Sequence, residues 1–199
     1  MFETIILILL IMFILIYKLK YKSIIVAIEA FNNKIYLVND LPDSQIAANL
    51  LAKIMIIVDK LVTKIIIGYD SGLSNSISRD KEYINYIRII KKKLPFVKIS
   101  ENPINSQYTS YSINKGEELV FCIRSKSNNQ IHDINELMYV AVHEISHIGC
   151  PETGHTRLFA KINLFLLQKA VQMGLYHYRD YASNPVEYCG MILTTSILG

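Results

Sequence analysis

The first 17 residues form one almost uninterrupted apolar run. Residues 4–17 read TIILILLIMFILIY and carry no charge, and Glu3 is the only charged residue before them. A helix that crosses a bilayer needs about 20 apolar residues, with a range of about 17–25. The alternatives are a buried core helix and a cleaved signal peptide, and the latter needs a basic start and a small-residue cleavage site that are absent here. The pattern predicts an uncleaved transmembrane anchor over residues 1–22.

The charges that flank this run predict its orientation. Lys18, Lys20 and Lys22 follow the apolar residues, whereas no Lys or Arg precedes them. Because positively charged flanks stay on the cytoplasmic side, the bulk of the chain is expected to face the cytoplasm. We therefore expect a single-pass membrane protein, with a stalk or linker over residues 23–33 and one folded domain over residues 34–199.

Beyond the stalk, the spacing of apolar residues indicates a strand followed by helices. Residues 34–39 (KIYLVN) have the composition of a strand. Apolar residues then recur at helical spacing over 44–63, with Asp43 as the N-cap. A second helix is expected over 82–93, because Pro95 restricts the residues before it.

The middle of the chain contains three further strand-like segments. Residues 96–100 are the first of them. Residues 109–113 and 118–124 resemble a hairpin, with its turn at 114–116. A short sheet is therefore expected directly before the next helix.

That next helix has clear start and stop signals. Asp133 followed by Glu136 three residues later forms a capping box. Gly149 and Pro151 are expected to end the helix.

A last helix is expected over residues 156–173, with Gly174 as its C-cap, and residues 176–199 are expected to be irregular. The predicted fold class is α+β, with an N-terminal transmembrane helix before a small domain.

Charge and cysteine content narrow the classes of function. The formal net charge is only +4 and the lysines are scattered, so a nucleic-acid-binding surface is not expected. The three cysteines, Cys122, Cys150 and Cys189, are too few for a disulfide framework and are expected to be buried. A bridge between Cys150 and Cys189 stays open if the compartment is oxidising.

The chemistry is concentrated in His143-Glu144-Ile145-Ser146-His147. Two histidines at positions i and i+4 lie on one face of a helix and can share one metal ion. A catalytic zinc ion needs three protein ligands and one open position. Glu144 is then the candidate general base, although this short motif also occurs by chance on ordinary helices.

His155 is the candidate third ligand, because Pro151 and Gly154 supply a turn that can bring it back to the helix. Glu152 is the alternative, since a carboxylate can also bind zinc. His132 and His177 are expected at the surface.

The tyrosines offer donors that could assist the site. A hydrogen-bond donor beside the metal would stabilise an oxyanion, and Tyr188 is the candidate of most interest, with packing beneath the site as its other interpretation. Sequence alone does not rank the candidates, which are Tyr108, Tyr111, Tyr178, Tyr181 and Tyr188.

The three histidines, followed by Arg157-Leu158-Phe159, resemble the WLM (Wss1-like) and SprT-like groups of minimal zincin metallopeptidases. Together with the segment 184–191 (NPVEYCGM), they look still more like membrane-anchored WLM-like proteins of large DNA viruses. The resemblance is confined mainly to residues 105–191 and implies a zincin-like domain over residues 34–199. It implies His143, His147 and His155 as ligands of one zinc ion and Glu144 as the catalytic acid and base. The gap before His155 is longer than the WLM pattern, so the substrate is not transferred.

The resulting hypothesis is a membrane-anchored zinc metallopeptidase that acts on a protein or peptide, in a host-cell or virion membrane if the protein is viral. A substrate could add as a strand beside the sheet edge. One alternative is a non-catalytic membrane or virion structural protein that zinc stabilises. Another is an enzyme that hydrolyses a different amide.

Overall fold

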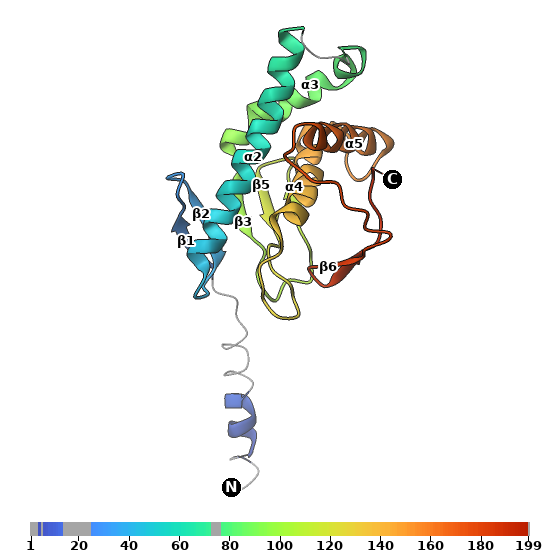
Figure 1. The fold of residues 1–199 in the computed structure, drawn as a ribbon. Coiled ribbons are helices and arrows are strands. Elements are labelled where there is room, and N and C mark those ends of the chain that lie inside the picture. Colours follow the sequence, from blue (N-terminus) through green and yellow to red (C-terminus); the bar gives the residue numbers. More distant parts are fainter. Residues whose placement is uncertain (1–3, 5, 14–24, 73–76, 199) are drawn as a thin grey trace.

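The computed structural model describes residue 4 and residues 6–13, 25–72 and 77–198, and it shows an α+β fold (Figure 1). A mixed five-stranded sheet runs in the order β1-β2-β3-β5-β4. Its strands are β1 (Ile25–Glu29), β2 (Ile35–Asn39), β3 (Lys98–Glu101), β4 (Tyr111–Ile113) and β5 (Glu118–Phe121).

The two outer pairs of the sheet are antiparallel and the centre is parallel. β1 pairs antiparallel with β2, and β4 pairs antiparallel with β5. β3 runs parallel to both β2 and β5. β4 is therefore an edge strand, and the predicted hairpin of two strands before the site-bearing helix is confirmed.

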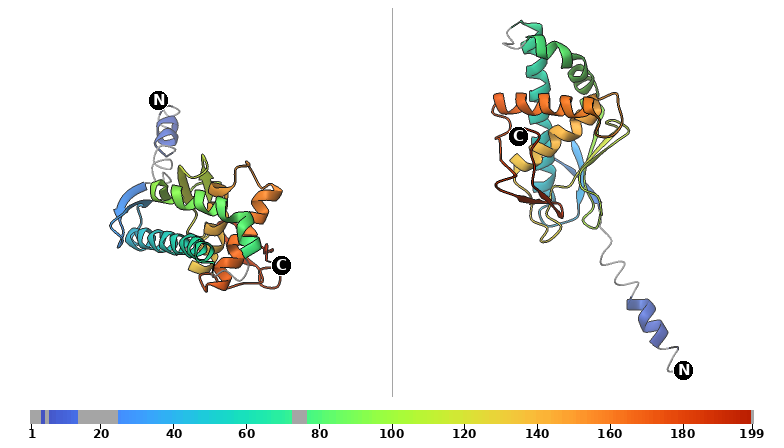
Figure 2. Two further views of the ribbon diagram at one scale, coloured as in Figure 1. Left: turned by 90° about the horizontal axis from the view of Figure 1, so that it is seen from above. Right: turned by 90° about the vertical axis from the view of Figure 1, so that its right-hand side faces the viewer.

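The helices pack together on the sheet and on one another (Figure 2). α2 (Ser44–Asp70) contacts β1, β2 and β3, and α4 (Ile134–Gly149) contacts both α2 and β4. β2 shows the two-sided character of the sheet, since Tyr36 and Val38 are buried whereas Ile35 and Leu37 are exposed. The remaining helices are α3 (Ile77–Lys93), the 3-10 helix η1 (Leu94–Phe96) and α5 (Arg157–Gln172).

The boundaries of α2 and α3 differ from the prediction. α2 continues to Asp70 because apolar residues persist beyond position 63, and Ile65 is 3% exposed in the core. α3 begins at Ile77, five residues earlier than the expected start at 82.

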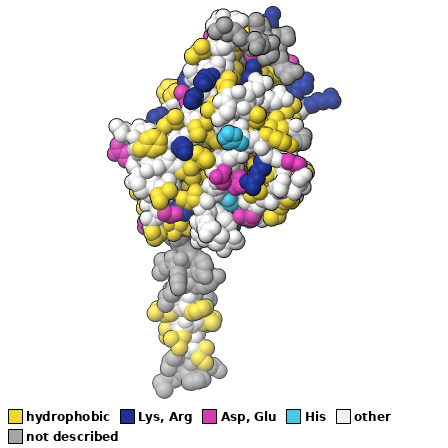
Figure 3. Space-filling model, viewed as in Figure 1, with side chains coloured by type: hydrophobic (Ala, Val, Ile, Leu, Met, Phe, Trp, Pro, Cys, Tyr) yellow, Lys and Arg dark blue, Asp and Glu magenta, His cyan; other side chains and the backbone are white. Residues whose placement is uncertain are grey.

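Among the described residues, the surface in Figure 3 has no dense group of basic side chains: Lys and Arg side chains are dispersed there among apolar and uncharged ones.

The tail beyond α5 contains a second, two-stranded sheet that the sequence reading missed. β6 (Val186–Tyr188) pairs antiparallel with β7 (Met191–Leu193). The two turn residues, Cys189 and Gly190, have φ values of 54° and 82°, and positive φ at both positions matches a type I′ turn.

A disulfide joins Cys122 to Cys189, so the bridge considered between Cys150 and Cys189 is wrong. Cys150 is free and buried, as expected. The bridge ties the turn between β6 and β7 to the residue that follows β5.

The expected transmembrane helix over residues 1–22 is wrong, and the single-pass membrane localisation with a cytoplasmic domain falls with it. The described helical residues 6–13 measure only about 12 Å at about 1.5 Å per residue, against a hydrocarbon core of roughly 30 Å. α2 is longer, but it carries charges at positions such as Lys53, Asp59 and Lys60. No helix within the described ranges has both the length and the apolar composition for a bilayer crossing. Residues 14–24, which include the flanking lysines, lie outside the described residues.

The expected stalk also contains regular structure. Residues 25–29 form β1 and pair along their length with β2, from Ile25 opposite Asn39 to Glu29 opposite Ile35. The sheet therefore begins before residue 34.

Candidate metal centre

α4 holds the first part of the candidate site in a well-defined place. The Asp133 carboxylate caps the helix by accepting a hydrogen bond from the Asn135 amide at 2.8 Å. Glu136 does not complete the predicted capping box, because its carboxylate accepts a hydrogen bond from Arg179 at 2.8 Å instead. At the other end, a Cβ on Gly149 would lie 2.9 Å from the Ile90 side chain, so glycine permits the close approach of α3.

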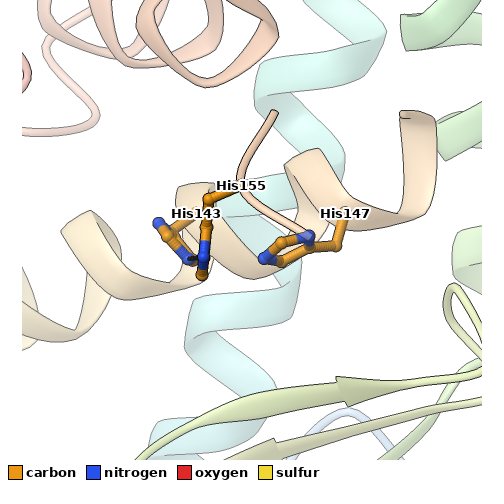
Figure 4. A group of neighbouring side chains, drawn as sticks. All are labelled: His143, His147 and His155. Carbon is orange, nitrogen blue, oxygen red and sulfur yellow. Dashed lines mark hydrogen bonds between the residues drawn. The ribbon is translucent and has the colours of Figure 1, made fainter. Parts of the chain in front are cut away.

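His143 and His147 are one helical turn apart on α4, as the spacing predicted. His155 comes from the loop between α4 and α5, directly before the α5 N-cap Thr156. Figure 4 shows the three imidazoles turned toward one another. The structure thus brings the third histidine back to α4.

The three histidines can form a metal site. One ligand atom from each lies within 4.8 Å of the others. The Nε2 atoms of His143 and His155 are 3.0 Å apart. Glu152, the alternative third ligand, lies in the cavity wall but outside this group.

The Phe159 ring packs against all three imidazoles. Its ring stacks on His147 with centroids 4.1 Å apart, and it meets His143 and His155 edge-on at 4.9 Å and 5.0 Å. Phe159 is 3% exposed and belongs to the first turn of α5. In the sequence, Phe159 is part of the segment that resembles WLM zincins, and its position four residues after His155 is a signal for the contact.

Burial changes the protonation of the residues on α4. Burial, with contributions from His147 and His155, lowers the pKa of His143 to about 4. Burial, together with His155 and Lys115, lowers the pKa of His147 to about 4. Burial raises the pKa of Glu144 to about 7. At neutral pH these two histidines are therefore neutral, which is the form that binds metals.

A cavity of about 910 Å³ opens over the three histidines. Glu144 is 4% exposed and lies in its wall. Residues 109–112, which run into β4, line one part of the cavity, and residues 191–195, which begin with β7, line another. The cavity is thus bordered by an edge strand of the main sheet and by the hairpin of the tail.

Two of the five candidate tyrosines, Tyr111 and Tyr188, line this cavity, and Tyr139, which was not singled out, lines it as well. The Tyr188 hydroxyl is 2.6 Å from Ser110 Oγ, and burial raises the pKa of Tyr188. Tyr188 is 2% exposed, in agreement with packing beneath the site.

The prediction for His132 is wrong, whereas His177 is exposed as expected. The His132 side chain is 6% exposed and its ring packs against Tyr188, with centroids 5.1 Å apart. His132 Nε2 also accepts a hydrogen bond from the Cys189 amide at 3.3 Å. It therefore supports the hairpin of β6 and β7.

Comparisons with solved structures give only a weak likeness. The crystal structure of Wss1 from Saccharomyces cerevisiae has 19% sequence identity and a TM-score of 0.36, and the match covers 50% of this chain and 82% of that chain. A likeness at this level carries no argument about function. No protein-family model matches the chain.

Sequence comparisons reveal relatives among virus proteins. The chain is 39% identical over 166 residues to "Uncharacterized protein R325" of Acanthamoeba polyphaga mimivirus, which covers 83% of this chain and 80% of that protein. It is 38% identical over 82 residues to protein 136R of Invertebrate iridescent virus 6, which is 40% of this chain and 43% of that protein. The expected likeness to virus proteins is confirmed, whereas the membrane anchor expected with it is not. This chain belongs to the family of protein R325 of Acanthamoeba polyphaga mimivirus.

Proposed function

We propose that this protein is a zinc-dependent metallopeptidase in which His143, His147 and His155 hold one zinc ion and Glu144 is the general base. The observation that carries the proposal is the group of three histidine ligand atoms within 4.8 Å of one another, on residues that line a cavity. The motif resemblance to WLM zincins supports the same assignment.

The donor set fits zinc. Zinc accepts imidazole nitrogens at about 2.0–2.1 Å in a tetrahedron, which separates two ligand atoms by about 3.3 Å. The Nε2 atoms of His143 and His155 are 3.0 Å apart, close to that separation. Three histidines leave the fourth position open, and this is the arrangement of a catalytic site and not of a closed structural site.

Bound zinc would polarise the scissile carbonyl and make water a stronger nucleophile at neutral pH. Glu144 does the proton transfer: its carboxylate accepts a proton from the attacking water and delivers it to the nitrogen of the leaving amine. The C–O bond forms first, and the C–N bond breaks once the amine nitrogen has taken up this proton. Because Glu144 is buried in the cavity wall next to His143, its carboxylate is held near the reacting groups without being one of the three ligands.

The substrate is a peptide in an extended conformation. β4 pairs with β5 on one side only among the described strands, so its other edge offers unpaired backbone groups. Residues 109–112 line the cavity, and a peptide can add there as a further strand through backbone hydrogen bonds. This geometry favours a peptide bond over a different kind of amide.

The test compares the full chain with its Glu144→Gln and His147→Ala variants. Zinc content is measured after purification, and cleavage is followed on a mixture of denatured proteins by mass spectrometry of the new termini. The proposal expects one zinc ion in the parent and in Glu144→Gln, cleavage by the parent alone, and loss of zinc from His147→Ala.

Other results would redirect the proposal. If the parent and Glu144→Gln both contain zinc and neither cleaves any protein, a structural zinc site is favoured, because such a site needs no general base. A parent protein without zinc would contradict the proposed metal centre.

A further inference from the structure

The segment that carries the third histidine has few attachments of its own. Residues 151–155 connect α4 to α5 without regular secondary structure, and all five are exposed. Among the described residues, the backbone of this segment makes one hydrogen bond with the rest of the protein, and the carbonyl oxygen of Pro151 accepts it. Something must fix this loop if His155 is to stay beside α4.

Lys115 makes that attachment. It lies in the turn between β4 and β5, and its ammonium group donates hydrogen bonds to the carbonyl oxygens of Cys150, at 3.3 Å, and Pro151. These are the first carbonyl groups after the last residue of α4, where a cation is also favoured by the helix dipole. One side chain therefore holds the beginning of the loop against the sheet.

The turn that presents Lys115 is itself fixed. The Lys115 carbonyl accepts a hydrogen bond from Lys93 at 2.9 Å. A Cβ on Gly116 would lie 3.0 Å from the Ile148 side chain, so the turn packs directly on α4. Lys115 has a φ of 53°, a conformation that few side-chain-bearing residues adopt. The ammonium group thus has a rigid support.

We propose that Lys115 is a positioning residue for the metal centre, which acts by holding the loop that presents His155. The inference rests on the proposed zinc site. Residues that orient a metal ligand typically change metal affinity by about 10–100-fold when they are removed. Loss of Lys115 frees the loop, so binding through His155 must first order it again.

The positive charge of Lys115 has the opposite effect on zinc affinity. An ammonium group beside the site repels a divalent cation, so removal of the charge alone would strengthen zinc binding. The two effects therefore differ in sign. Lys115 lies close enough to lower the pKa of His147, so this electrostatic effect is a real competitor.

The experiment measures zinc affinity of the full chain by competition with a chelator of known affinity. The variants are Lys115→Met, Lys115→Arg, His155→Ala and the double variant Lys115→Met/His155→Ala. Lys126→Met is the matched control, because Lys126 also donates to a backbone carbonyl, that of Tyr108, outside the loop. Circular dichroism and denaturant unfolding of each metal-free variant establish that it is folded.

We expect about tenfold weaker zinc binding in Lys115→Met, recovery in Lys115→Arg, and no change in Lys126→Met. In the His155→Ala background the Lys115→Met substitution should have no further effect, because the two residues act through one contact.

Unchanged or tighter zinc binding by Lys115→Met would overturn the inference, although the proposed zinc site would remain. An equal loss in the His155→Ala background would also overturn it. A parent that binds no zinc would end both this inference and the proposed function.

Discussion

Phe159 shows how a single side chain can serve both the core and the site. Its ring contacts all three imidazoles and is 3% exposed. Phe159→Ala is expected to lower the free energy of unfolding by about 3–5 kcal/mol and to weaken zinc binding, because a cavity replaces the support of the ligands. Phe159→Leu, which keeps most of the volume, should cost only roughly 1–1.5 kcal/mol. Denaturant unfolding in chelator and zinc titration measure the two effects; equal stability of the two variants would contradict this role.

Asp43 gives a pH dependence that can be assigned to one pair. Arg124 is 5% exposed and donates to Asp43 and to Glu101, both at 2.7 Å. The hydrogen bond from Arg124 lowers the pKa of Asp43 below its ordinary 3.8. The stabilisation of the fold by the Asp43–Arg124 pair is therefore complete at pH values above the ordinary pKa of 3.8, and it is lost as the pH falls through the lowered pKa of Asp43.

The variant Asp43→Asn isolates this contribution. The unfolding free energy is measured at pH about 6 and at pH about 3, and its decrease between the two should be smaller in Asp43→Asn than in the parent. The difference between the two proteins should be below about 1 kcal/mol, because the Asp43 side chain is 37% exposed. The matched control is Asp59→Asn, since the ion pair of Asp59 with Lys91 is exposed. A pH dependence identical in all three proteins would remove Asp43 as its source.

At the residue scale, the sequence predicts the parts of the site that depend on local spacing. His143 and His147 share a helix face because of their i and i+4 positions, and the structure places them accordingly. The position of His155 depends on how the loop folds back, which local spacing does not determine. His132 was placed wrongly, because its burial depends on a hairpin 57 residues away along the chain.

At the scale of elements, helices were easier to predict than strands. Asp133 and Thr156 cap α4 and α5 with local hydrogen bonds, and such signals are visible in the sequence. β1 owes its structure to pairing with β2, which no local pattern reveals. The hairpin of β6 and β7 was missed because its turn is Cys189-Gly190, without the Asn-Gly signature of such turns.

The disulfide that attaches this hairpin should contribute to the free energy of unfolding. Cys122 and Cys189 are 67 residues apart, and closure of a loop of that length contributes about 4 kcal/mol in the chain-entropy view. A reductant should therefore lower the unfolding free energy of the parent by up to about 4 kcal/mol. In the double variant Cys122→Ala/Cys189→Ala it should have no effect. Cys150→Ala is the matched control, because Cys150 is free and buried, and it should keep the full response to reductant.

At the scale of the whole molecule, the apolar composition of the N-terminal residues led to a wrong prediction. The apolar run at the N-terminus predicts a transmembrane helix, but none of the helices in the described residues is both long and apolar enough to cross a bilayer. The order of the sheet, with β3 between β2 and β5, also could not be derived, because parallel pairing joins segments far apart in sequence. The α+β class itself was within reach, since helical and strand periods alternate along the chain.

Metal binding should connect the site with the stability of the whole fold. His143 and His147 belong to α4, whereas His155 lies directly before the N-cap of α5, and Phe159, which contacts it, lies in the first turn of α5. An ion that binds all three therefore links two helices in the folded state alone. Binding at a free zinc concentration of 100 times the dissociation constant raises the free energy of unfolding by about 2.7 kcal/mol.

Thermal unfolding in zinc and in chelator tests this linkage. The parent and Glu144→Gln should gain the same stability from zinc, because Glu144 is not a ligand in the proposed site. His147→Ala should gain much less, and its stability in chelator should stay near that of the parent because His147 is only partly buried. A zinc response in His147→Ala as large as that of the parent would mean that the ion binds elsewhere on the molecule. A zinc response in Glu144→Gln much smaller than that of the parent would instead assign Glu144 a place among the ligands, and the general base would have to be sought in another residue of the cavity.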